Sequence, residues 1–164
     1  MQIFNNFNLT SLPKLRDDLT CLYCNKNRLN ELVNLYSAIK LLDFSENEIT
    51  HLINLPENLE LLFCNDNKLT ILKNLPKSLK ILNCSNNNIT EIELPPKLET
   101  LQINYNNLKF LPALPSTFQH CVQRCKTPII DTFSLDFCGF YYLQYIFLSY
   151  YKHLLLCSYN ILAV

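Results

Sequence analysis

Residues 59–69 read Leu-Glu-Leu-Leu-Phe-Cys-Asn-Asp-Asn-Lys-Leu, and a closely similar pattern returns about every 20 residues along most of the chain. A half unit precedes the complete units, and a degenerate unit begins near Phe118. A sequence that repeats with a period of roughly 20 to 50 residues is typical of a solenoid, in which each coil buries its apolar side chains only against neighbouring coils. The complete units begin near Leu19, Ile39, Leu59, Leu79 and Leu98.

Asparagine occupies the ninth position of all five complete units. This position follows the short apolar run that we expect to form a β-strand, where the chain must turn. A turn carries backbone N–H and C=O groups away from water, and an asparagine side chain can both donate to and accept from them. We therefore predict a structural asparagine ladder rather than a catalytic role for Asn27, Asn47, Asn67, Asn87 and Asn106.

The repeat, with Leu at positions one, four, eleven, fourteen and seventeen and Asn at position nine, resembles the leucine-rich repeat over roughly residues 3–122. The Leu55-Pro56 and Leu75-Pro76 junctions resemble those of bacterial type III effectors. The composition, rich in Asn, Ile, Lys, Tyr and Phe, resembles giant-virus leucine-rich repeat proteins. The resemblance implies an α/β-type repeat solenoid, a right-handed coil with short parallel β-strands on its concave face and an irregular or extended convex side.

The composition changes after the repeats, so we expect a solenoid over residues 1–126 and a hydrophobic, aromatic tail over residues 127–164. Residues 131–164 hold 10 of the 19 Phe and Tyr residues. A C-terminal helix that caps the last coil is the interpretation we favour, because solenoid ends need covering. A membrane segment over residues 139–164 is an alternative, although a central Lys152 would cost about 2.5–3.5 kcal/mol on insertion. An aberrant end of a degenerate gene is a third.

Charge and glycine content argue against several classes of function. Lys and Arg total 14, as do Asp and Glu, whereas nucleic-acid binders usually carry a basic excess. The chain has one glycine, and glycine-rich phosphate loops need several. His51, His120 and His153 lie in unrelated sequence contexts, and no paired carboxylates accompany them. We therefore expect no enzymatic activity, no cofactor and no metal.

The eight cysteines are interpreted mainly as structural. Cys24, Cys64 and Cys84 fall at an inward strand position, where cysteine behaves as a small apolar residue. The first residues show no signal-peptide pattern, so we expect a reducing compartment, the cytoplasm, or the host cytoplasm if the chain is viral. Cys21-x-x-Cys24 lies in a predicted strand rather than at a helix N-terminus, which disfavours redox chemistry. A weaker cluster, whose spacing matches no standard zinc site, comprises His120, Cys121, Cys125 and Cys138.

The third and fifth positions of each unit should point outward from the concave face. Leu41, Leu61 and Ile81 form an apolar ladder there, and an apolar patch rimmed by polar residues is typical of a contact surface. Two alternatives are that the ladder packs on the chain's own C-terminal tail or that it only supports β propensity. The predicted partner-binding residues are Tyr23, Leu41, Asp43, Leu61, Phe63, Ile81, Asn83 and Tyr105.

Two hypotheses about function follow. The first is a monomeric, non-catalytic module that binds an unidentified protein or peptide, and no nucleic acid, through the concave face. The second is a degenerate or truncated repeat protein with little selected activity, associated with membranes through its tail. The apolar ladder favours the first hypothesis and the tail favours the second.

Overall fold

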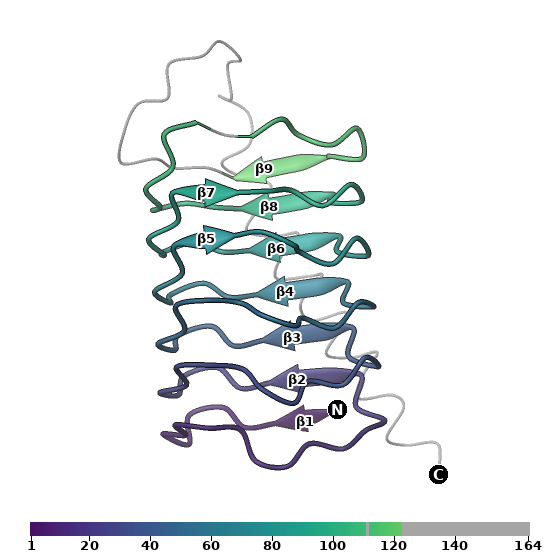
Figure 1. Cartoon of the computed structure of the whole chain (residues 1–164), viewed down its shortest axis with the longest axis vertical. Helices are drawn as coiled ribbons and strands as arrows, with labels where there is room; N and C mark the ends of the chain where they lie inside the picture. The colour runs from purple at the N-terminus through teal and green to yellow at the C-terminus, as the bar shows by residue number, and fades with distance from the viewer. Residues whose placement is uncertain (111, 123–164) are drawn as a thin grey trace. The chain divides into compact units, whose positions relative to one another are not determined.

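The computed structural model describes residues 1–110 and 112–122, which form a stack of similar coils (Figure 1). Each coil contributes one short strand to a parallel seven-stranded sheet, in the order β1-β2-β3-β4-β6-β8-β9. Residues at equal positions of successive units pair, as Leu61 does with Leu41 and Ile81. The predicted parallel-strand solenoid is confirmed. The strands are β1 (Gln2–Ile3), β2 (Cys21–Tyr23), β3 (Leu41–Asp43), β4 (Leu61–Phe63), β6 (Ile81–Asn83), β8 (Thr100–Gln102) and β9 (His120–Val122).

A second, two-stranded parallel sheet joins β5 (Ile71–Leu72) and β7 (Glu91–Ile92). The sequence predicted only irregular or extended backbone for this side of the coil. Backbone bonds from Thr90 N–H to the Thr70 carbonyl and from Glu93 N–H to the Leu72 carbonyl, both 2.9 Å, extend the pairing. Threonine and isoleucine are β-branched and favour strands, which accounts for pairing between these two coils.

The predicted C-terminal helix and the predicted boundary at residue 126 lie outside the described residues. The same holds for the candidate membrane segment, residues 139–164. Within residues 1–110 and 112–122, the structure contains no helix long and apolar enough to cross a bilayer.

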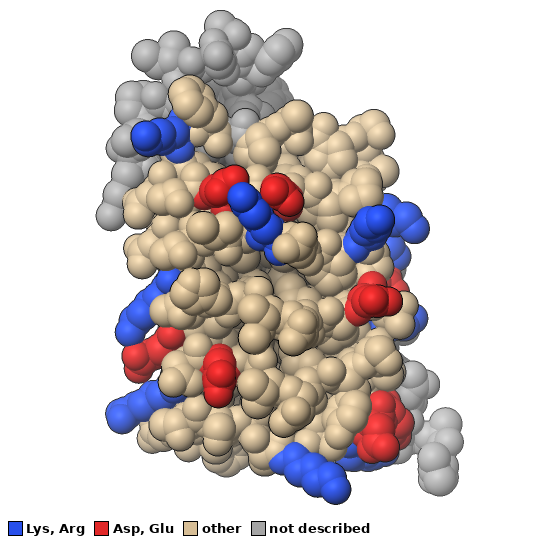
Figure 2. All heavy atoms as spheres, in the orientation of Figure 1, with Lys and Arg blue, Asp and Glu red and all other residues tan. Residues whose placement is uncertain are grey.

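Charged side chains at equal positions of neighbouring units lie next to opposite charges. Glu60 stands between Lys40, at 3.5 Å, and Lys80, at 2.6 Å. On another column, Glu48 contacts Lys68 at 2.8 Å. Basic and acidic side chains are accordingly intermixed on the face drawn in Figure 2. Water screens such exposed pairs, so they contribute more to the register of the coils than to stability.

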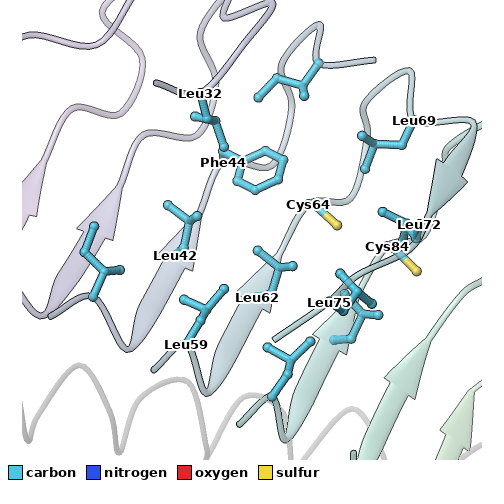
Figure 3. Packing of buried hydrophobic residues seen from close by; sticks show 14 of the residues in the cluster. Leu32, Leu42, Phe44, Leu59, Leu62, Cys64, Leu69, Leu72, Leu75 and Cys84 are labelled. Atoms are coloured by element: carbon cyan, nitrogen blue, oxygen red, sulfur yellow. The ribbon is translucent and has the colours of Figure 1, made fainter. Parts of the chain in front are cut away.

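The interior of the coil is lined by the residues that the repeat places inward. Leu42, Leu62 and Leu82, the central residues of three consecutive strands, are fully closed to solvent. Figure 3 shows Phe44, Cys64 and Cys84 in the same packed layer. Burying a leucine or phenylalanine side chain contributes roughly 1.5–3 kcal/mol. The inward residues of successive coils belong to a single buried cluster, so the core is continuous along the stack.

Each asparagine of the ladder joins two adjacent coils through its side chain. The Asn67 amide donates to the carbonyls of Cys64 and Asn65 in its own coil and of Phe44 in the preceding coil, at 3.1–3.2 Å. Its Oδ1 accepts the backbone N–H of Ile49 at 3.0 Å. Asn67 is 8% exposed, so these bonds form away from water. Corresponding contacts are made by Asn27, Asn47, Asn87 and Asn106.

We predict that Asn67→Ala lowers the free energy of unfolding by roughly 1–3 kcal/mol, because buried backbone groups lose their partner. A urea melt followed by circular dichroism measures the change. Asn88→Ala is the matched control, since that side chain is exposed and should tolerate the change. Equal melts for the two variants would contradict a stabilising role for the ladder.

A second role of asparagine is to occupy left-handed backbone positions. Among the described residues, ten other than glycine have positive φ, and seven of them are Asn or Asp. Asn34, Asn54 and Asn74 recur at the sixteenth position of their units. The short unit that begins at Leu79 lacks this position, so Glu93 is followed directly by Leu94. Asparagine tolerates the left-handed region better than most residues, and here it replaces the scarce glycine.

The eighth position of each unit is left-handed even where it is neither Asn nor Asp, as at Glu46, where φ is 54°. We predict that Glu46→Gly stabilises the fold. Holding a non-glycine residue in the left-handed region destabilises the fold by roughly 1–2 kcal/mol. Glycine avoids this strain, but it loses more conformational entropy on folding, which offsets about 0.5–1 kcal/mol of the gain. The expected net gain is about 0.5–1 kcal/mol, measurable as a higher urea midpoint. Glu48→Gly is the control. Glu48 is ion-paired, as Glu46 is, but its φ is ordinary, so glycine at this position should lower the free energy of unfolding.

Candidate partner-binding surface

The surface in question is the outer face of the seven-stranded sheet. In β2, β3, β4, β6 and β8 the central side chain is a leucine that is fully closed to solvent, so the first and third side chains point outward. Two rows result, and the strand register aligns their members across neighbouring coils. The first row is Cys21, Leu41, Leu61, Ile81 and Thr100, and the second is Tyr23, Asp43, Phe63, Asn83 and Gln102.

Seven of the eight predicted partner-binding residues lie on these two rows. Tyr105 does not, because it occupies the turn after β8, where its φ is 54° and its side chain is 45% exposed. It belongs to the left-handed column of Glu46 rather than to the sheet.

Access to the outer face differs along the stack. Tyr23 is 4% exposed, Leu41 and Asp43 are each 3% exposed, and Leu61 is 8% exposed. By contrast, Phe63, Ile81 and Asn83 are half-buried, as are Thr100 and Gln102 on β8. The outward side chains over β2 and β3 are therefore closed to solvent, whereas those over β6 and β8 can be reached. The sequence pattern gives direction alone and could not reveal this difference.

Polar side chains form a bonded belt beside the second row. The Asp43 carboxylate accepts from the Asn25 amide at 2.9 Å and from the Ser45 backbone N–H at 3.0 Å. The Ser45 hydroxyl lies 2.8 Å from Asp43 Oδ1 and 2.7 Å from Asn65 Oδ1, so its one proton serves either oxygen in turn. The Asn83 amide reaches the same Asn65 oxygen at 3.2 Å. The belt links four coils, and its signal in the sequence is the alternation of Asn and Ser at position seven.

The buried cysteines act as packing residues. Cys24 and Cys64 are fully closed to solvent and carry free thiols. Burial raises the pKa of both thiols well above their ordinary range, and the Asp43 carboxylate raises it further. The Cys64 thiol donates to the Asn83 carbonyl of the next strand at 3.3 Å. The His120 cluster considered from the sequence involves side chains outside the described set.

We predict that Cys24 and Cys64 resist Ellman's reagent at pH 8 in the folded chain and react once it is unfolded in urea, because only a thiolate attacks the reagent. The raised pKa also makes stability depend on pH. Above about pH 9 the unfolded chain loses thiol protons that the folded chain keeps, so the free energy of unfolding falls as pH rises. Urea melts at increasing pH check the sign. A Cys24→Ala, Cys64→Ala double variant should lose less stability over the same range.

Comparison with known proteins gives likenesses among solved structures. No protein-family model and no curated protein matches the chain. YopM from Yersinia enterocolitica WA-314 is 36% identical, with a TM-score of 0.68 over 71% of this chain and 26% of that one. A Shigella effector leucine-rich repeat domain is also 36% identical, with a TM-score of 0.66 over 68% of this chain and 52% of that domain. YopM from Yersinia pestis is 30% identical, with a TM-score of 0.63 over 74% of this chain and 41% of that one.

The stacked coils, their parallel sheet and these likenesses define a leucine-rich repeat protein. Its repeats resemble the repeat domains of bacterial effectors. The chain spans between about a quarter and a half of the length of these solved chains. The likeness to giant-virus proteins stays a prediction. Repeat solenoids of this kind typically serve as interaction modules.

Proposed function

We propose that this chain is a non-catalytic recognition module that binds a protein or peptide through the outer face of the seven-stranded sheet. The observation that carries the proposal is the apolar row of Leu41, Leu61 and Ile81. The inward residues and the asparagine ladder hold the coils together. Stacking therefore does not require leucine at the outward positions. A contiguous apolar row at such positions is typical of a contact surface.

The pattern of access defines how a partner would meet this row. Leu41 and Leu61 are 3% and 8% exposed, so they support the surface more than they present it. Phe63, Ile81 and Asn83 are half-buried and can be touched directly. The likeness to an effector repeat domain supports a protein partner, and the buried thiols fit the expected reducing compartment.

We predict that affinity capture from a cell lysate retains a partner on the full chain and loses it on Leu61→Glu and on Ile81→Glu. Because Leu61 is 8% exposed, Leu61→Glu should also lower the free energy of unfolding, whereas Ile81 is half-buried and Ile81→Glu should largely keep it. A carboxylate in the apolar row would have to be desolvated in the complex. Circular dichroism and a urea melt on each variant establish that the fold is kept. Ile71→Glu is the matched control, because that residue is an exposed isoleucine on the second sheet.

The outcomes separate the hypotheses. Loss of stability in both row variants, without a change in capture, would identify the row as an internal contact. Equal capture by all four proteins, or none by any of them, would favour the degenerate-repeat hypothesis.

A further inference from the structure

We infer that the part of the outer face over β6 and β8 binds an uncharged, extended peptide segment, whose backbone is held by the side-chain amides of Asn83 and Gln102. The inference rests on the proposed function and names the partner chemistry of the same face. Asn83 and Gln102 lie opposite each other across adjacent parallel strands, as do Ile81 and Thr100 in the neighbouring row.

Access favours direct contact with this part of the face and with the neighbouring Phe63 of β4. The outward residues of β2 and β3 are 3–7% exposed, and those of β6 and β8 are all half-buried. Ile81 and Thr100 supply an apolar floor and a hydroxyl next to the two amides.

Charge determines what kind of segment fits. The four outward side chains of β6 and β8 are uncharged. In the nearest charged column, Lys80 lies 2.6 Å from Glu60, whose carboxylate raises the pKa of Lys80, and the Glu99 carboxylate raises it further. A charged side chain of a partner would lose its water here without gaining an opposite charge, which is costly. The surface therefore favours uncharged residues.

The amides match the groups of an extended backbone. Asn83 uses one N–H toward Asn65 Oδ1 and one lone pair toward the Ser85 backbone N–H, both at 3.2 Å. A side-chain amide offers two donors and two lone pairs, so one of each is left over from these two bonds. Neighbouring strands lie about 4.8 Å apart. An extended residue presents its N–H and C=O on the same side of the chain. The side-chain amides of Asn83 and Gln102 can therefore form hydrogen bonds with both backbone groups of one peptide residue.

A phage-displayed library of random linear peptides of about 12 residues, selected on the immobilised full chain, tests the inference. We expect enriched sequences to lack charged residues at their common positions. Titration of one enriched synthetic peptide should give a Kd that changes less than about threefold between low and high salt. The Asn83→Asp, Gln102→Glu double variant should bind it at least about tenfold more weakly, because two donors become carboxylates. Asn88→Asp, an exposed position on another column, should bind it as the wild type does.

The inference and the proposed function fail in different ways. Enriched peptides that bind the double variant as tightly as the wild type, yet lose affinity to Ile81→Glu, would overturn the amide contact and leave partner recognition standing. A charged consensus with steep salt dependence would overturn the inferred chemistry. Selection that enriches nothing would overturn peptide binding, and the capture experiment would then decide the proposed function alone. Circular dichroism on the double variant, and a second variant with Gln102→Ala only, guard against misfolding.

Discussion

The bonds that each ladder asparagine makes to two coils at once are the constraint on which the rest of this structure depends. After β2, β3, β4, β6 and β8 the backbone turns, and N–H and C=O groups there would otherwise be buried without partners. Asn47 shows the solution, since its amide donates to the carbonyls of Cys24 and Phe44 while its Oδ1 accepts from Leu29 N–H. The left-handed residue just before it, Glu46, completes the turn. One side chain thus fixes both the path of its coil and the distance to the preceding coil.

The fixed spacing between coils determines which side chains of neighbouring coils lie next to each other. Once coils are held in register, each position of the repeat becomes a column whose neighbours lie about 4.8 Å apart. At that distance like charges would repel, and the column of Lys40, Glu60 and Lys80 alternates in sign. Apolar residues in inward columns build the core, and apolar residues in an outward column build a patch. The surface of this protein can therefore be read as a set of columns with separate chemistry.

Much of the fold could be predicted from the sequence because the period sets the register. The positions of Leu61 and Leu62 within the repeat were enough to predict a strand, its direction and which side chain enters the core. The second sheet was not predicted, since Leu72 and Ile92 differ little from Leu32 and Leu52, which stand at the equal position of coils that do not pair there. The left-handed column of Asn34 was also missed, because a periodic asparagine indicates a special position without giving its φ.

The candidate surface was less predictable than the fold, for a physical reason. Alternation along a strand states which way Leu41 and Ile81 point, and it assigns both to one row. It contains no information about how much solvent reaches each of them, which differs between 3% exposed at Leu41 and half-buried at Ile81. Tyr105 was grouped with the sheet by its place in the repeat, yet its left-handed backbone sets it on the turn.

This division between fixed and variable columns indicates where recognition is encoded. The coil needs leucine inside, asparagine at the turn and a tolerant residue at the left-handed position, and these needs account for most of the similarity between one leucine-rich repeat and another. None of these structural requirements applies to the outward positions three and five. Ile81 and Thr100 beside Asn83 and Gln102 are therefore residues that the backbone does not require, and the chemistry they present together, apolar and amide without charge, is where we expect a partner to be distinguished.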